Sequence, residues 1–159
     1  MKLLTFLIFR LFVLLFAIMP FWFFYRVSDF ICLILYYVVR YRKKVVFQNL
    51  RNSFPLKSDE EITKIAKGFY KYLTDILLES IKMYSMSKKQ MLKRVKFPNQ
   101  EFIDSYAKNK QSVILVMGHY GNWEWGAIVG AYVLLHKNVG LYKPLRNKYL
   151  DDYVRKVRA

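Results

Sequence analysis

The N-terminal residues restrict the possible folds more than any other part of the sequence. Across residues 3–25 the only charged side chain is Arg10, and about 20 apolar residues are enough for a helix to cross a bilayer about 30 Å thick. We therefore expect an N-terminal membrane helix, in which Arg10 reaches the headgroups along its aliphatic stem. A second apolar run, residues 30–39, is too short to cross alone. It either lies in the interface or continues the first helix beyond a kink at Pro20.

A cleaved signal peptide is the alternative interpretation of this region, because Lys2 precedes the apolar stretch. Signal peptides end in small residues at the cleavage site, whereas residues 21–25 are Phe-Trp-Phe-Phe-Tyr. The pattern favours an uncleaved anchor over residues 1–40, either transmembrane or interfacial. A basic cluster follows it, which is typical of the cytoplasmic side and attracts anionic headgroups: Arg40, Arg42, Lys43 and Lys44.

The net charge is strongly positive. The 159 residues include 27 Lys and Arg against 11 Asp and Glu, a formal charge of +16. Such a surplus implies an anionic partner, which can be nucleic acid or a lipid surface. The apolar N-terminus favours the lipid surface and argues against nucleic acid.

Helical signals dominate the middle of the chain. Residues 58–61, Ser-Asp-Glu-Glu, form a capping-box pattern, and apolar residues then recur every three or four positions as far as Tyr84. We expect one long amphipathic helix, on which Asp75 and Glu79 are solvated or paired with lysine rather than catalytic. Residues 82–96 are basic, either an exposed face or a connector. A short helix is expected from Pro98 to the polar turn at residues 108–111.

The last third of the sequence predicts an α/β arrangement. Residues 112–117, Ser-Val-Ile-Leu-Val-Met, form a continuous β-rich apolar run that is typical of a buried strand. A helix is expected over residues 122–135 and a second strand over residues 138–142, with the two strands parallel. Residues 41–159 are therefore interpreted as an α/β domain that follows the anchor.

The junction after the first predicted strand carries the candidate chemistry. There His119 would lie at the carboxyl end of the strand, where open α/β sheets bind ligands, and Asn122 would cap the next helix. Glu124, in the first helical turn, could fold back toward the imidazole. A carboxylate on one ring nitrogen fixes the tautomer and leaves the other nitrogen as a base. The alternative is a plain hydrogen bond between His119 and Glu124 without a catalytic role.

Covalent and metal-assisted mechanisms lack the residues that they need. The single cysteine, Cys32, lies within the predicted anchor, and the sequence contains no Gly-x-Ser-x-Gly elbow. A substrate hydroxyl would therefore have to attack, with His119 removing its proton. The only histidines are His119 and His136, and there is no His-Glu-x-x-His motif. This disfavours zinc, and no cofactor is expected.

Three blocks of this sequence resemble the lipid A biosynthesis acyltransferases, lauroyl- and myristoyl-acyltransferase-like members of the lysophospholipid acyltransferase-like superfamily. Residues 119–124, His-Tyr-Gly-Asn-Trp-Glu, are similar to the family's His-x4-Glu/Asp block. Residues 142–147, Tyr-Lys-Pro-Leu-Arg-Asn, followed by Leu150, Asp151 and Arg158, are similar to its Tyr-Arg-Pro-x-x-Asn segment. Residues 48–55, Gln-Asn-Leu-Arg-Asn-Ser-Phe-Pro, resemble a stretch that follows its N-terminal anchor. Order and spacing agree over essentially the whole chain.

The resemblance implies a bacterial inner-membrane enzyme with its catalytic part on the cytoplasmic face. It would move a fatty acyl chain from acyl carrier protein to a hydroxyl of a lipid A precursor, with His119 as general base and Glu124 as its partner. Arg158 matches an arginine that contacts substrate phosphate or supports the site, and Arg146 or Arg155 could replace it. Asn122 belongs to the motif and would shape the helix start. Acyl carrier protein is acidic and the precursor is phosphorylated, so the basic surface would attract both.

The resemblance also implies that the chain is truncated, because members of the family continue beyond the equivalent of Ala159. Residues 41–159 would then be the N-terminal part of an acyltransferase catalytic domain, the first part of an α/β sandwich, and the chain would be an inactive fragment. Two other functions stay open. One is acyl transfer to another lipid acceptor, such as a glycerolipid or an ornithine lipid. The other is a non-enzymatic, membrane-anchored basic protein, which would explain the charge but leave the His119 to Glu124 block without a role.

Overall fold

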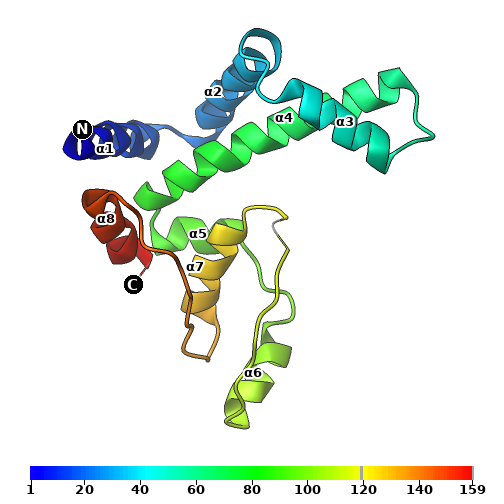
Figure 1. Ribbon diagram of the computed structural model, residues 1–159. Coiled ribbons are helices and arrows are strands. Elements are labelled where there is room, and N and C mark those ends of the chain that lie inside the picture. Colours follow the sequence, from blue (N-terminus) through cyan, green and yellow to red (C-terminus); the bar gives the residue numbers. More distant parts are fainter. Residues whose placement is uncertain (119, 159) are drawn as a thin grey trace. The chain divides into compact units, whose positions relative to one another are not determined.

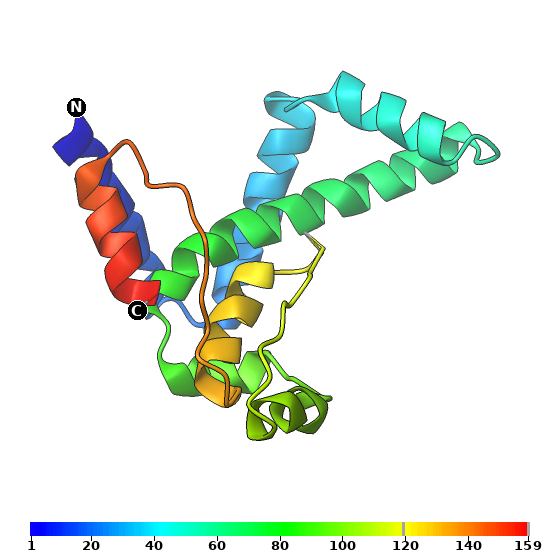
Figure 2. The same ribbon diagram turned by 60° about the horizontal axis from the view of Figure 1, so that its bottom comes forward.

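The fold of the described residues is helical. The computed structural model describes residues 1–118 and 120–158, shown in Figures 1 and 2. The helices are α1 (Lys2–Ile18), α2 (Phe21–Leu33), a π-helical turn η1 (Ile34–Val38), α3 (Lys43–Ser53), α4 (Asp59–Lys82), a 3-10 turn η2 (Met83–Ser85), α5 (Lys88–Arg94), α6 (Gln100–Lys108), α7 (Trp123–Val133) and α8 (Lys148–Arg158). They form two compact units. Unit 1 comprises Met1–Ala17 and Ser80–Ala159, and unit 2 comprises Ile18–Glu79.

The predicted α/β sandwich is wrong, because no residue in the described ranges belongs to a β-strand. Residues 112–117 and 138–142, where strands were expected, carry no regular secondary structure. Their apolar side chains are not in a core either: Ile114 is 91% exposed and Leu141 is 100% exposed. An extended segment becomes a strand only when its N–H and C=O groups pair with a neighbouring segment. The apolar sequence of such a segment does not show whether a neighbouring segment is available for pairing.

The N-terminal apolar region is two helices, not one. α1 ends at Ile18, and α2 begins after Pro20, whose φ of −64° and ψ of 150° place it outside the helix. Proline is well tolerated here because the first residues of a helix have no intrahelical partner for their N–H groups. Among the described helices, the stretch Phe21–Val38 is long and apolar enough to cross a membrane by length and composition. The expected continuous span over residues 3–25 is therefore wrong, and the kink at Pro20 is confirmed as a break.

Arg10 has an aromatic partner that the sequence did not predict. In unit 1 its guanidinium carbon lies 4.6 Å from the centre of the Tyr153 ring on α8, a cation–π geometry. The Tyr153 ring also contacts Phe9 of α1 at 6.1 Å and Tyr84 at 5.7 Å between ring centres. α8 therefore packs along α1, as Figures 1 and 2 both show.

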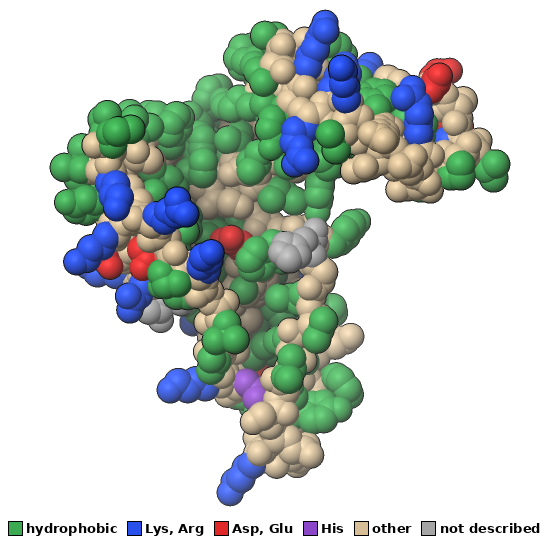
Figure 3. All heavy atoms as spheres, in the orientation of Figure 1, with side chains coloured by type: hydrophobic (Ala, Val, Ile, Leu, Met, Phe, Trp, Pro, Cys, Tyr) green, Lys and Arg blue, Asp and Glu red, His purple; other side chains and the backbone are tan. Residues whose placement is uncertain are grey.

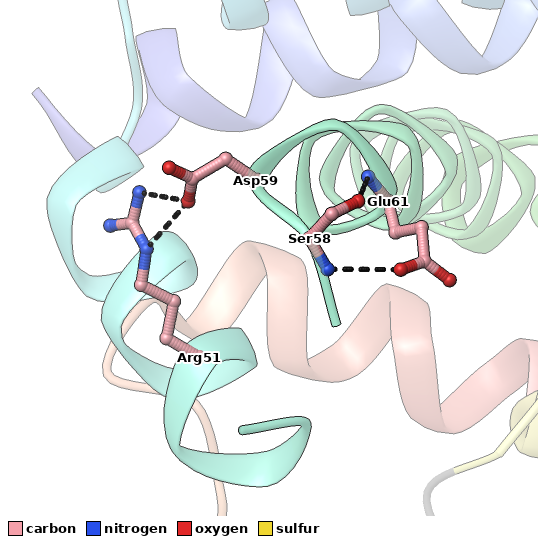
Figure 4. Close-up of polar contacts among 4 residues, drawn as sticks. All are labelled: Arg51, Ser58, Asp59 and Glu61. Atoms are coloured by element: carbon pink, nitrogen blue, oxygen red, sulfur yellow. Dashed lines mark hydrogen bonds and ion pairs between the residues drawn. The ribbon is translucent and has the colours of Figure 1, made fainter. Parts of the chain in front are cut away.

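α4 begins as the sequence predicted. The Glu61 N–H donates to Ser58 Oγ at 3.3 Å, and the Ser58 N–H donates to Glu61 Oε2 at 2.9 Å, which is the reciprocal pair of a capping box. Arg51 on α3 donates to Asp59 at 3.0 Å, and Figure 4 shows both contacts. The helix runs from Asp59 to Lys82, so the expected long amphipathic helix is confirmed.

The charge of Glu61 contributes to this helix start. Its pKa is lowered to about 2, first by the hydrogen bond from Lys57 and then by the backbone N–H of Ser58. A carboxyl with a depressed pKa stabilises the fold above its unfolded value of about 4.3 and loses that contribution as the pH falls toward 2. Acidification to that range is therefore expected to loosen the first turn of α4.

We predict that Ser58→Ala destabilises the start of α4 by about 1 kcal/mol, because Glu61 loses the acceptor for its backbone N–H. Hydrogen exchange of the amides at residues 59–63 in the full chain should accelerate several-fold. The control is Ser53→Ala, which removes the hydroxyl of an exposed serine at the end of α3. Equal protection of residues 59–63 in both variants would show that the cap does not stabilise the helix.

Candidate functional site

The candidate site is built around the start of α7 in unit 1. Gly121 has a φ of +67°, a conformation that glycine adopts without strain, and it turns the chain into the helix. Asn122 then accepts a hydrogen bond on Oδ1 from the Trp125 N–H at 3.3 Å. This confirms the predicted cap. Residues 112–117, which were predicted to form a strand before this junction, carry no regular secondary structure.

Glu124 lies where the sequence placed it, in the first turn of α7, and its side chain is half-buried. The next residue, Trp125, is 5% exposed, and Val129 one turn later is 1% exposed. These two side chains hold one face of α7 in the core of unit 1 and so fix the backbone from which Glu124 projects. A carboxylate near a helix N-terminus also interacts favourably with the helix dipole.

His119 lies outside the described residues, so the predicted pairing of its imidazole with Glu124 is not tested by geometry. The five-residue separation of His119 and Glu124 was predicted to require a turn and a helix start between them. Gly121 and Asn122 supply both. Glu124 is thus in the first helical turn and His119 precedes the turn in the chain. The dyad stays a prediction.

The far end of α7 is tied to α6 by side chains that the sequence analysis did not single out. Asp104 Oδ1 accepts from the Leu135 N–H at 2.8 Å, and Gln100 Nε2 donates to the Val133 carbonyl at 2.6 Å. Leu135 first and Gln100 second lower the pKa of Asp104 through these hydrogen bonds. Asp104 is therefore an ionised acceptor for the chain just beyond α7, and helix ends require such partners.

Asp151 organises the second family-like block. Its side chain is buried at 8% exposure. Oδ1 accepts from the Leu145 N–H at 2.8 Å, and Oδ2 accepts from the Tyr142 hydroxyl at 3.5 Å. The backbone carbonyl of Asn147 accepts from the Asp151 N–H at 2.9 Å, and Asn147 Oδ1 accepts from the Tyr149 N–H at 3.2 Å. The block is thus a turn that leads into α8 and is held by one carboxylate.

The turn is also tied to the N-terminus. Asn147 Nδ2 donates to the carbonyl of Lys2 at 2.8 Å, and the rings of Phe6 and Tyr149 are stacked with centres 6.0 Å apart. Residues more than 140 positions apart are therefore in contact. The sequence motif predicted a functional segment here, whereas its packing against α1 had no signal in the sequence.

The candidate arginines are located as follows. Arg146 lies in the turn held by Asp151 and is exposed, and Arg155 is an exposed residue of α8. The backbone of Arg158 ends α8, and its side chain is outside the described set. Their role in binding substrate phosphate stays a prediction.

Among the side chains that the structure describes, no group of three or more His, Cys, Asp or Glu residues could hold a metal ion. His136 Nε2 lies 3.0 Å from the Gln111 carbonyl oxygen, a structural contact. The expectation of a metal-free reaction remains untested, since His119 is not among these residues.

Comparison with known proteins gives a family. The model of the family described as "Bacterial lipid A biosynthesis acyltransferase" matches residues 2–159, which is the whole chain apart from its first residue. No curated protein and no solved structure matches the chain. The match includes the α7 junction, the turn held by Asp151 and the stretch over residues 48–55.

We predict that Asp151→Ala releases the turn over residues 142–147. The Leu145 N–H loses its part-buried hydrogen bond to the Asp151 carboxylate, and a hydrogen bond to a charged group typically contributes about 1.5–3 kcal/mol. Hydrogen exchange of the peptide covering residues 141–150 should accelerate by at least tenfold. The matched control is Asp152→Ala, because the neighbouring carboxylate is exposed. Identical exchange in the two variants would mean that Asp151 does not hold the turn.

Proposed function

Because the chain belongs to the bacterial lipid A biosynthesis acyltransferase family, we propose that it transfers a fatty acyl chain from acyl carrier protein to a hydroxyl of a lipid A precursor. The observation that carries this proposal is the match over residues 2–159, which includes the His119 to Glu124 block. The capped helix start that bears Glu124 supports it. Family membership favours this function over a non-enzymatic basic protein, and favours lipid A precursors over glycerolipid or ornithine lipid acceptors.

In the proposed mechanism His119 acts as general base. One ring nitrogen takes the proton of the acceptor hydroxyl as its oxygen attacks the thioester carbonyl of the acyl donor. The tetrahedral intermediate then collapses, the ester bond forms, and the carbon–sulfur bond breaks. The proton on the imidazolium passes to the departing thiolate, so the enzyme returns to its starting state without an acyl-enzyme.

Glu124 supports this base from the start of α7. Its carboxylate would bind the second ring nitrogen of His119, hold the imidazole in one tautomer and stabilise the imidazolium. Asn122 serves this arrangement by fixing the helix start through its bond to the Trp125 N–H. Asn122 is thus a positioning residue for Glu124.

Positive charge would bring both substrates to the enzyme. The formal charge of +16 attracts acyl carrier protein, an acidic partner, and the phosphates of the acceptor. Arg158 is the proposed phosphate ligand, with Arg146 and Arg155 as the alternatives in the same segment. A guanidinium can bind a phosphate through two parallel hydrogen bonds.

The proposed location is the bacterial inner membrane, with the catalytic part on the cytoplasmic face. Two observations support it. Phe21–Val38 has the length and apolar composition of a membrane helix, and Arg40, Arg42, Lys43 and Lys44 follow it directly. Clustered basic residues beside an apolar helix are typical of the cytoplasmic side.

We predict that His119→Ala lowers kcat for acyl transfer by about 10²–10⁴-fold, the usual contribution of a general base. Glu124→Gln should lower kcat less and shift the pH profile, because the imidazole loses its ionised partner. The matched controls are His136→Ala and Glu101→Gln, which remove the same chemical groups elsewhere in unit 1. Full activity of His119→Ala in membranes that carry the enzyme would refute the mechanism.

We also predict that replacing the phosphate-binding arginine by alanine raises KM for the acceptor about tenfold and leaves kcat nearly unchanged, since it weakens ground-state and transition-state binding equally. Arg158→Ala, Arg146→Ala and Arg155→Ala, assayed in parallel, identify the residue. The effect should vanish with an acceptor that lacks the phosphate. A higher KM that persists with that acceptor would assign the arginine a structural role instead.

A further inference from the structure

α2 and the η1 turn that continues it have two different faces in unit 2. One face carries polar side chains that are bonded to α4, described below. The opposite face is exposed and mainly apolar, with Arg26 the charged residue on it, one turn from Trp22 and one turn from Phe30. Its apolar side chains are 42–75% exposed: Trp22, Phe23, Phe30, Leu33, Tyr37 and Val38.

The polar face of α2 is paired with α4 by a series of side-chain contacts. The Tyr25 hydroxyl donates to Glu79 Oε1 at 2.7 Å, and the Ser28 hydroxyl donates to Asp75 Oδ1 at 2.6 Å. Asp29 accepts from Lys71 Nζ at 3.1 Å. Later along the chain, the rings of Tyr36 and Tyr70 meet edge to face with centres 5.2 Å apart.

These contacts make α2 and α4 an antiparallel pair over much of the apolar helix. From Tyr25 to Tyr36 a helix advances about 16 Å at 1.5 Å per residue, roughly half of the hydrocarbon thickness of about 30 Å. If α2 crossed the bilayer in this pairing, the segment of α4 that contains Lys71, Asp75 and Glu79 would have to enter the hydrocarbon with it. If α2 separated from α4, Ser28 and Asp29 would enter without partners.

Both alternatives are unfavourable in lipid, where charged and unpaired polar groups are expensive. α2 carries a further charge, since the side chain of Arg26 is 78% exposed and lies 3.9 Å from Asp29. Among the described helices α4 is not one that could cross a membrane by length and composition. α4 is therefore expected to stay in water or among headgroups, and the pairing keeps α2 beside it.

We propose that the α2–η1 helix lies in the plane of an anionic bilayer surface and does not cross it. The proposal rests on the membrane location proposed above and decides between the transmembrane and interfacial alternatives. The exposed apolar face of α2 enters the acyl region, while α4 covers the polar face from the water side. Interfacial helices of this kind bury one apolar face about 5–10 Å deep.

Charge complementarity identifies the lipid as anionic. Arg40 and Arg42 have positive φ values of 53° and 49°, so the chain turns sharply where α2–η1 ends. Lys43 Nζ then lies 3.8 Å from the centre of the Tyr36 ring, which ties the turn to the end of the helix. Figure 3 shows Lys and Arg side chains gathered over α3 and the chain before it. Each basic residue near an anionic surface adds to its attraction.

The test compares a position before α2 with a position after α3 by their access to a membrane-impermeant maleimide. In a Cys32→Ser background, single cysteines replace Ile18, which is 80% exposed, or Leu56, which is 99% exposed. The full chain is expressed in a Gram-negative host. In inverted inner-membrane vesicles we expect both cysteines to react, and in spheroplasts we expect neither to react until detergent is added.

Two outcomes would overturn the inference. Labelling of Ile18→Cys only from the periplasmic side would show that α2 crosses, and resistance of this cysteine from both sides would place the end of α2 within the hydrocarbon. Flotation of the Cys32→Ser parent with the membranes separates this test from the proposed location. A parent that remained in the soluble fraction would contradict the membrane location itself, whatever the labelling pattern.

Discussion

The structure depends on the pairing of each N-terminal apolar helix with a helix that follows much later in the chain. In unit 1, Tyr153 of α8 contacts Phe9 and the guanidinium of Arg10 on α1. In unit 2, Ser28 and Asp29 of α2 contact Asp75 and Lys71 of α4. Both pairings give a polar or charged group on an apolar helix a specific partner, which is the condition for burying it without a large penalty.

These pairings explain why the sequence predicted the helix caps correctly but did not predict the partners of the side chains on the apolar helices. The capping box at Ser58 and the cap at Asn122 were predictable because a cap depends on side chains within three or four residues. The partners of Arg10 and Asp75 were not, since they lie on helices that are distant in the sequence. Asp75 was expected to be solvated or paired with lysine, and it accepts from Ser28 instead.

The failed prediction of two strands has the same origin. Periodicity and β-propensity describe one segment at a time, whereas a strand exists only through its neighbour. Residues 112–117 satisfy the local pattern, yet Ile114 and Val116 are about nine-tenths exposed, at 91% and 89%. By contrast α7, whose cap and apolar residues lie within the helix itself, was predicted to within two residues at each end. The predicted helix start at Asn122 was therefore confirmed, although the predicted element before it was wrong.

The geometry of the proposed dyad depends on backbone conformation as much as on the two side chains. Gly121, at a φ of +67°, has no atom within 4 Å of an added Cβ, so an alanine there would meet no steric clash with neighbours. It would still prefer a negative φ, because the left-handed conformation costs an L-residue roughly 1–2 kcal/mol. Relief of that strain would rotate the chain between His119 and the Asn122 cap. The Gly121→Ala variant would still contain His119. A loss of acyl transfer with α7 intact would therefore show that activity requires the correct orientation of this base as well as its presence.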